Sequence, residues 1–119
     1  MIEKVIEISM LYDFYGQLLT PKQQEIMGLY YADNFSLSEI AEEFGISRQG
    51  VHDTVKRAEK SLQDYEEKLG LIKQTMATKE TMQKIENELD GIIIENKENE
   101  KLNARLNKLK SMIGTINSA

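Results

Sequence analysis

The fold is decided by residues 19–62, which read LTPKQQEIMGLYYADNFSLSEIAEEFGISRQGVHDTVKRAEKSL. Three helical patterns follow one another closely in this stretch, and a turn that contains glycine precedes the last of them. This is the layout of a helix-turn-helix, a unit that presents one exposed helix to a groove. The stretch therefore favours a binding protein over an enzyme, and we expect no catalytic activity.

Capping residues predict where these helices begin and end. Residues 2–19 form a first apolar stripe at helical spacing. The next two helices each open on an N-cap followed three residues later by Gln or Glu, the pairs being Thr20 with Gln23 and Ser36 with Glu39. Ser47 is expected to cap the fourth helix, and Gly45 and Gly70 are expected to terminate the third and fourth.

The composition excludes several classes of function. Of 119 residues, 40% are hydrophobic and 29% are charged, with one proline, one histidine and no cysteine. Disulfides and thiolate chemistry are thereby excluded, and one histidine gives no basis for a zinc site. The N-terminus lacks a signal-peptide pattern, and no apolar run is long enough to span a membrane. We therefore expect a soluble, cytoplasmic, all-α protein without metal, cofactor or membrane contact.

Charge is divided unevenly along the chain. Residues 1–70 hold 7 Lys and Arg against 13 Asp and Glu, a net charge of −6, whereas residues 71–119 hold 8 against 7, a net charge of +1. Phosphate contacts supply much of the affinity for nucleic acid, so the helix-turn-helix half needs a local basic patch. Residues 48–60 retain one, with four basic and two acidic side chains.

The fourth helix carries the candidate recognition surface. Its inward face is predicted to comprise Val51, Val55, Ala58 and Leu62. Its polar face supplies the candidate nucleic-acid contacts, which are Arg48, Gln49, His52, Lys56 and Arg57. Arg can bond guanine through two donors, Gln can bond adenine, and Lys can hold phosphate. The alternative interpretation is that these side chains form the solvated face of a helix.

After Gly70 the pattern changes to two apolar seams that need a partner surface. The first comprises Met82, Ile85, Leu89 and Ile92, and the second Leu102, Leu106, Leu109 and Ile113. Asn96 and Asn99 interrupt the pattern, so we expect a bent, broken or hinged helix, or a solvated middle. The seams could fold back on the first domain or pack against a second copy, and we favour a homodimer. The domains are then 1–70, the helix-turn-helix, and 71–119, a helical dimerisation or docking segment.

A second basic patch is predicted near the C-terminus. Lys101, Arg105 and Lys108 lie along one side of a helix, and no acidic residue follows Glu100. This stripe could lie on RNA or on the acidic first domain. A solvated face opposite the second seam is the alternative interpretation.

Two family resemblances follow from these motifs. The segment SLSEIAEEFGISRQGVHDTVKRAEKSL is similar to the fourth region of σ70-type transcription factors, in its S-L-x-E-I-A opening, its G-I-S turn and its V-x-x-x-V-x-R-A series. With 19 residues before Thr20, we do not expect a complete σ factor. The longer segment EKVIEISMLYDFYGQLLTPKQQEIMGLYYADNFSLSEIAEEFGISRQGVHD resembles the YlxM family of small bacterial proteins, over about residues 3–70.

The YlxM resemblance implies a σ70 region 4-like helix-turn-helix domain with a C-terminal helical extension. It also implies a role linked to the signal recognition particle, because the family's genes typically lie beside that of the particle's GTPase. Our first hypothesis is a homodimeric regulator that binds nucleic acid, either DNA or signal recognition particle RNA. The second is a protein-interaction adaptor whose acidic surface meets a basic partner, such as that GTPase, without reading nucleic acid.

Overall fold

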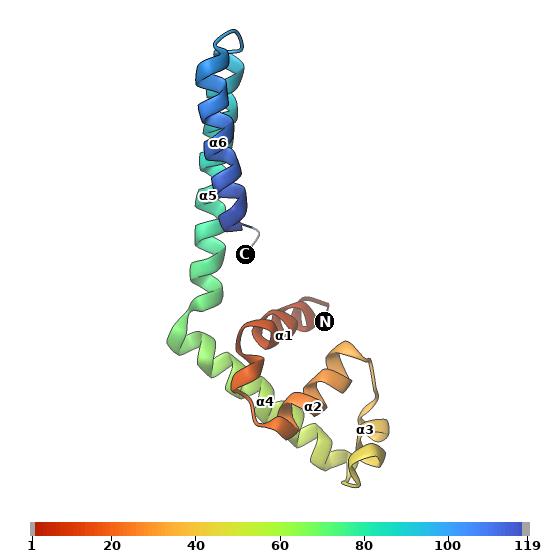
Figure 1. Cartoon of the computed structure of the whole chain (residues 1–119). Coiled ribbons are helices and arrows are strands. Elements are labelled where there is room, and N and C mark those ends of the chain that lie inside the picture. The colour runs from red at the N-terminus through yellow and green to blue at the C-terminus, as the bar shows by residue number, and fades with distance from the viewer. Residues whose placement is uncertain (1, 118–119) are drawn as a thin grey trace. The chain divides into compact units, whose positions relative to one another are not determined.

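The computed structural model describes residues 2–117, which form six α-helices and no strand. The helices, shown in Figure 1, are α1 (Ile2–Tyr15), α2 (Pro21–Met27), α3 (Leu37–Phe44), α4 (Arg48–Leu69), α5 (Leu71–Glu95) and α6 (Glu100–Asn117). A 3-10 turn, η1 (Gly16–Leu18), follows α1, and a π-helical turn, η2 (Gly28–Ala32), extends α2. The predicted all-α fold is confirmed. The chain divides into two compact units, residues 1–72 and 73–119, which are described separately.

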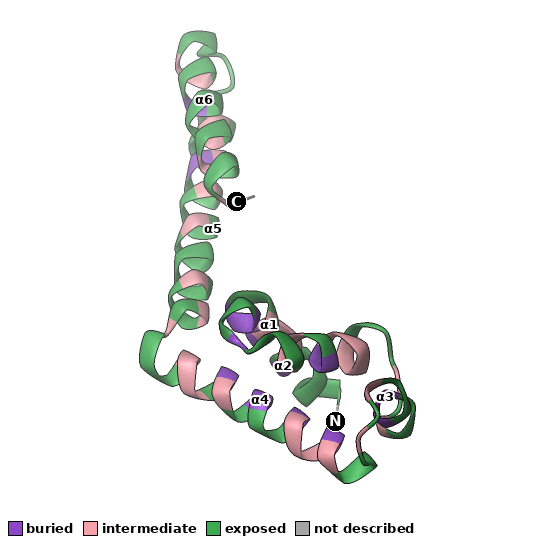
Figure 2. Cartoon of the chain, turned by 60° about the horizontal axis from the view of Figure 1, so that its bottom comes forward, coloured by how far each residue is buried: buried purple, intermediate pink, exposed green. Residues whose placement is uncertain are grey.

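The first unit is built around α4, which α1, α2 and α3 all contact. Figure 2 shows the buried positions of α4 on the side that faces these helices. The core consists of buried side chains from all four helices and the α1–α2 connection: Ile8, Leu11, Tyr15, Leu19, Ile26, Met27, Ile40, Ala41, Val51, Val55, Ala58 and Leu62. The inward face predicted for α4 is therefore confirmed, because all four of its residues are buried.

The helix starts follow the predicted capping chemistry. The Thr20 hydroxyl accepts from the Gln23 N–H at 3.2 Å, while the Gln23 side chain accepts from the Thr20 N–H at 3.1 Å. Ser36 and Glu39 repeat this reciprocal pair at 3.1 and 3.0 Å. Both capping boxes satisfy N–H groups that the first helical turn leaves without an intrahelical acceptor. The Glu39 carboxylate has a lowered pKa, chiefly because the Ser36 backbone N–H donates to it and so favours its charged form.

The turn of the helix-turn-helix is also confirmed. Gly45 adopts the left-handed conformation, with φ 65°, where a side chain would be strained. The Ile46 N–H then bonds back to the Ala41 carbonyl at 3.1 Å, and the half-buried Ile46 side chain packs against the core. Ser47 caps α4 by accepting from the Gly50 N–H at 3.0 Å. These contacts fix the point at which α4 begins.

The first helix is shorter than its apolar stripe predicts. α1 ends at Tyr15, and the chain passes through η1 before reaching Thr20. Thr20 precedes a proline, which disfavours helical geometry, and it is extended, with φ −64° and ψ 156°. The chain must therefore leave the helix before α2 can start. The buried side chain of Leu19 therefore belongs to this connection and not to a helix.

The second unit is an antiparallel helical hairpin formed by α5 and α6, which lie side by side in Figures 1 and 2. Leu89 of α5 and Leu106 of α6 are its buried residues, and Lys110 forms an ion pair with Asp90. The expected break is confirmed as a turn between the helices. The Asn96 side chain bonds the Ile92 carbonyl at 2.8 Å, and Asn99 accepts from the Leu102 N–H at 3.1 Å.

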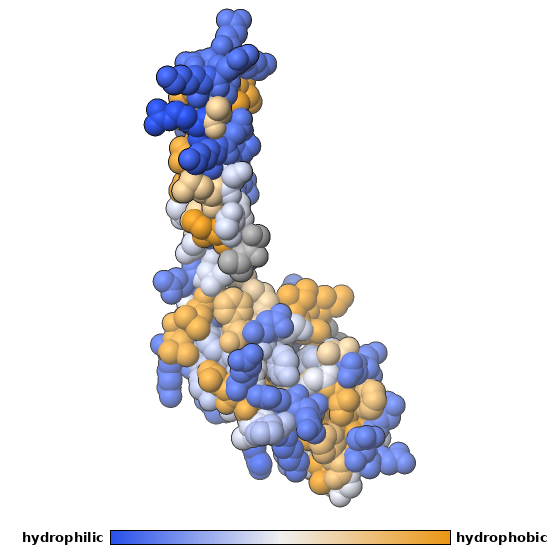
Figure 3. All heavy atoms as spheres, in the orientation of Figure 1, coloured by the Kyte–Doolittle hydropathy of each residue, from blue (hydrophilic) through white to orange (hydrophobic). Residues whose placement is uncertain are grey.

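The hairpin leaves much of its seam uncovered. Met82, Leu102 and Ile113 are half-buried, whereas Ile85, Ile92 and Leu109 are exposed, as are Ile94, Met112 and Ile116. Figure 3 shows that the end of the hairpin that carries the turn is hydrophilic. Among the helices of residues 2–117, none combines the length and apolar character needed to cross a membrane.

Candidate nucleic-acid interface

The first half of α4 carries the predicted recognition residues at the surface of the first unit. Arg48, Gln49, Lys56 and Arg57 are exposed, and His52 is half-buried. At 100° per residue, Gln49, Asp53, Lys56 and Lys60 follow one line along the helix, opposite the buried stripe. Arg57 lies on one flank of this line and His52 on the other. α4 thus presents a polar face on the side of the helix that points away from the core.

Arg48 and Arg57 differ from the neighbouring lysines of α4 because neither arginine is paired with a carboxylate within residues 2–117. Within residues 2–117, neither Arg48 nor Arg57 forms an ion pair or a side-chain hydrogen bond. The other α4 cations on this face are occupied: Lys56 pairs with Glu59 at 3.5 Å and Lys60 with Asp64 at 3.4 Å. In a unit whose acidic residues outnumber its basic ones, two free guanidinium groups are available to an incoming anion.

Gln49 and His52 are already engaged with a neighbouring carboxylate. The Gln49 amide donates to Asp53 at 3.0 Å, and His52 Nδ1 lies 3.6 Å from the same Asp53 oxygen. Asp53 places a negative charge in the middle of the face, where phosphate would be repelled. For Gln49 to contact a base, its amide must therefore give up the hydrogen bond to Asp53 and form one to the edge of the base. Gln49, His52, Lys56 and Arg57 lie within about 140° around α4, whereas Arg48, the first residue of the helix, lies about 180° from Arg57. Of the five predicted residues, only the two arginines are unoccupied within residues 2–117.

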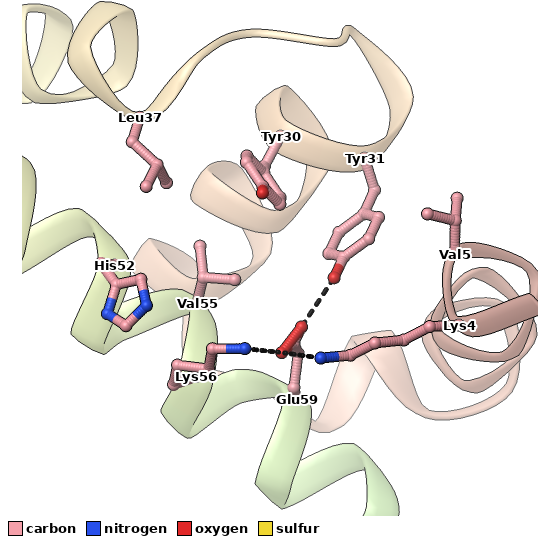
Figure 4. A pocket seen from close by; sticks show the side chains of 9 residues that line it. All are labelled: Lys4, Val5, Tyr30, Tyr31, Leu37, His52, Val55, Lys56 and Glu59. Atoms are coloured by element: carbon pink, nitrogen blue, oxygen red, sulfur yellow. Dashed lines mark hydrogen bonds and ion pairs between the residues drawn. The ribbon is translucent and has the colours of Figure 1, made fainter. Parts of the chain in front are cut away.

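Glu59 is the residue of this candidate site that the sequence did not reveal. Glu59 is only 5% exposed. The count of charges along residues 48–60 treated it as a surface acid that offsets the basic residues, but its side chain does not face solvent with them. Its carboxylate accepts from the Tyr31 hydroxyl at 2.6 Å and lies 3.5 Å from Lys56 Nζ and 4.0 Å from Lys4 Nζ. Figure 4 shows these groups converging from α1, η2 and α4. Because Glu59 is buried, the half-exposed Asp53 is the one acid between Arg48 and Lys60 that solvent reaches.

Burial and the Glu59 carboxylate together set the ionisation of Tyr31. Burial raises the pKa of Tyr31 well above the usual 10.0, and the hydrogen bond to Glu59 raises it further, because ionised Tyr31 would face a second negative charge. The neutral hydroxyl is therefore part of the folded structure at every physiological pH. It holds η2 against α4 beside the polar face of that helix.

The contribution of this hydrogen bond to stability should depend on pH. Tyr31 has a higher pKa when folded than when unfolded, so its stabilising effect is complete below pH 10 and declines as the pH rises above 10. At about pH 7 we expect Tyr31→Phe to lower the free energy of unfolding by about 1 kcal/mol. Near pH 11 the difference between the two proteins should narrow measurably.

Urea unfolding of both proteins at the two pH values measures this difference. The other four tyrosines are common to both proteins, so subtracting one free energy from the other isolates the contribution of Tyr31. A difference that stays constant from pH 7 to about pH 11 would show that the hydroxyl–carboxylate contact does not persist in solution.

Comparison with known proteins agrees with this architecture. Residues 2–110 match the model of a family described as "Putative helix-turn-helix protein, YlxM / p13 like". The chain belongs to the YlxM / p13-like family. It is 44% identical over 111 residues to the YlxM protein of Bacillus subtilis, which covers 93% of this chain and 97% of that protein.

Other relatives have similar identity over shorter alignments. A family protein of Halalkalibacterium halodurans is 48% identical over 90 residues, 76% of this chain and 83% of its own length. One from Desulforamulus reducens is 48% identical over 85 residues, 71% of this chain and 73% of its own. The predicted family resemblance is thereby confirmed, and with it a helix-turn-helix family rather than a known family of enzymes.

The YlxM / p13-like match also includes the second predicted basic patch. Lys101, Arg105 and Lys108 are all exposed on α6, and none forms an ion pair within residues 2–117. Lys110 differs from them, because it is held by Asp90 of α5.

The acidic residues Glu39, Glu42 and Glu43 line a shallow surface depression with Phe35. In the described part of the chain, no group of three His, Cys, Asp or Glu side chains is arranged to hold a metal ion.

Proposed function

We propose that this YlxM / p13-like chain is a regulatory protein that binds nucleic acid through the first half of α4. Arg48 and Arg57 would supply the principal contacts, with Gln49, His52 and Lys56 beside them. The observation that carries this proposal is that Arg48 and Arg57 are both exposed on α4 and have no carboxylate partner within residues 2–117. The first unit engages Lys4, Lys56 and Lys60 with its own carboxylates and leaves these two guanidinium groups free.

The proposed biological context is the signal recognition particle in the cytoplasm. The support is the family resemblance, since YlxM genes typically lie beside that of the particle's GTPase. The particle contains RNA, so its RNA is the first nucleic acid to test. A mixed-sequence DNA duplex is the matched competitor, because a helix-turn-helix domain commonly enters the major groove of DNA.

The test is a fluorescence anisotropy titration of the full chain against signal recognition particle RNA and a mixed DNA duplex. Each is titrated at about 50 mM and about 200 mM salt, because purely electrostatic binding is lost over this range. RNA binding that persists at the higher salt supports the proposal with RNA as the target. Persistent binding to the duplex supports it with DNA as the target. Absence of binding to both at the lower salt overturns it.

We also propose that the α5–α6 hairpin joins two copies of the chain. Relative to the buried Leu89, Ile85 and Ile92 are displaced to the same side of α5 by about 40° and 60°. Leu109 and Ile116 are displaced from Leu106 of α6 in the same sense. Because the two helices are antiparallel, these offsets place all four exposed side chains on one face of the hairpin. Two such faces could pair about a twofold axis as a four-helix bundle.

This arrangement predicts a dimer that charge can disrupt. Light scattering at micromolar concentration should give twice the chain mass for the natural protein. Ile92→Lys with Leu109→Lys should give the monomer mass, because the two residues are exposed and their replacement leaves Leu89 and Leu106 in place. Gln83→Lys with Asn107→Lys adds the same charge on the other side and should remain dimeric. A monomer mass for the natural protein would contradict the proposal.

A second candidate function rests on the acidic surface of the first unit. Glu39, Glu42 and Glu43 are exposed together on α3, beside the half-buried Phe35. An adaptor of this kind would bind a basic partner, such as the particle's GTPase, without contacting nucleic acid. Replacing Glu42 and Glu43 with Gln should then weaken pull-down of the GTPase, whereas replacing Arg48 and Arg57 with Ala should not. A loss caused by the arginine variant alone would exclude the adaptor.

A further inference from the structure

A pocket of about 380 Å³ opens beside the recognition face of the first unit. It lies among α1, η2, the start of α3 and α4, and Figure 4 shows the side chains that line it. They are Lys4, Val5, Tyr30, Tyr31, Leu37, His52, Val55, Lys56 and Glu59. His52 and Lys56 belong both to this pocket and to the polar face of α4. A nucleic acid on that face would therefore pass the pocket mouth.

The walls of the pocket suit a flat, largely apolar group. Val5, Leu37 and Val55 supply aliphatic surface, and Tyr30 supplies an aromatic ring. Tyr30 meets Tyr31 edge to face, with ring centroids 5.0 Å apart and an interplanar angle of 89°. The Tyr31 hydroxyl is committed to Glu59, but within residues 2–117 the Tyr30 hydroxyl makes no hydrogen bond. Tyr30 thus offers a ring for stacking and a free polar group.

The charges of the pocket favour an anion at its mouth. The Lys4 and Lys56 ammonium groups approach Glu59 from two helices, so two positive charges face one negative charge. Both lysine side chains are more than half exposed, whereas that of Glu59 is 7% exposed. Each ammonium group has three N–H donors, and both lie at ion-pair distances of 3.5–4.0 Å from Glu59 and not at the distance of a short hydrogen bond. Donors on both lysines remain for a second acceptor that arrives from solvent.

We propose that this pocket takes one unstacked nucleotide of an RNA that is bound on α4. The base would stack on Tyr30 between the aliphatic walls, and its phosphate would lie against Lys4 and Lys56. Unpaired bases of RNA loops and bulges are commonly held on aromatic side chains in this way, whereas a continuous duplex keeps its bases stacked. The proposal rests on the proposed function and adds to it a preference for interrupted RNA helices.

The test compares two RNA hairpins that differ by one bulged nucleotide, titrated by anisotropy against the full chain. The bulged hairpin should bind roughly tenfold more tightly than the fully paired one. Tyr30→Leu should remove this preference, because leucine retains apolar volume but offers no aromatic face. Lys4→Gln should weaken the bulged complex selectively. The control Lys22→Gln removes an exposed charge from α2, outside the pocket, and should leave the preference intact.

The outcomes separate this proposal from the proposed function. Equal binding of the two hairpins by the natural protein would overturn the pocket proposal and leave nucleic-acid binding in place. A preference that survives in both Tyr30→Leu and Lys4→Gln would also overturn it, by placing the bulge elsewhere on the protein. No binding of either hairpin at low salt would overturn the proposed function itself. Near-ultraviolet circular dichroism of each variant establishes that the first unit is folded.

Discussion

Replacing Ile40 with alanine is expected to lower the free energy of unfolding of the first unit by about 2–5 kcal/mol. Ile40 is fully buried, and α3 is a short helix in which Ile40 and Ala41 are the buried residues. Truncating Ile40 removes apolar contact area and leaves a cavity between α3 and α4, the two helices of the helix-turn-helix. A small domain is stable by roughly 5–15 kcal/mol, so the loss is a large fraction of the total.

The chain offers a selective probe for this measurement. All five tyrosines and all three phenylalanines precede residue 73, so the near-ultraviolet circular dichroism signal reports on the first unit alone. We expect its thermal midpoint to fall by about 10 °C or more in Ile40→Ala. The matched variant Ile40→Val should cost about 0.5–1.5 kcal/mol. The exposed neighbour Glu42→Ala should change stability by less than about 0.5 kcal/mol.

A small effect of Ile40→Ala would show that α3 is not firmly packed in solution. The exposed arginines in the first half of α4 would then lack the fixed support that specific recognition requires. The same experiment thus tests the packing of α3 against α4, on which the candidate interface depends. Far-ultraviolet signals, which include α5 and α6, should change less steeply than the aromatic signal.

The parts of the fold that sequence predicted well are those governed by local chemistry. A capping box needs two side chains three residues apart, and Ser36 with Glu39 satisfies its own hydrogen bonds wherever the helix lies. Gly45 was identifiable for the same reason, since a left-handed residue in a tight turn favours glycine. The inward face of α4 followed from its apolar spacing alone. These signals depend on neighbours along the chain.

The features that sequence left undetermined depend on contacts between distant residues. Glu59 looks like any acid on a polar helix, but Tyr31 of η2 and Lys4 of α1 reach it in the folded unit. The sequence did contain one indication that Glu59 is buried. Its neighbour Ala58 belongs to the buried stripe of α4, and Glu59 lies only about 60° around the helix from Leu62 of that stripe. The break at Asn96 and Asn99 was visible in the sequence, but the direction in which α6 returns depends on contacts between distant residues, such as the ion pair of Lys110 with Asp90.

The second large effect concerns the two free arginines. Arg48→Ala with Arg57→Ala should weaken nucleic-acid binding at least tenfold and, where both residues contact phosphate, reduce the slope of log affinity against log salt by about 2. The matched control is Lys22→Ala with Lys68→Ala, which removes two exposed charges from the same unit but not from the first half of α4. Because net charge changes equally, a larger loss in the arginine variant assigns the contacts to α4.

Arginine-to-lysine substitution then determines what each arginine reads. Lysine keeps the positive charge but lacks the planar pair of donors that can bond guanine O6 and N7 together. A phosphate contact should therefore survive Arg57→Lys with little change in affinity or salt slope. A guanine contact should lose about 1–3 kcal/mol on guanine-containing targets alone, with the salt slope unchanged. If the double alanine variant binds as tightly as the control variant, the arginines are solvated surface, and the acidic face of α3 becomes the stronger candidate for partner binding.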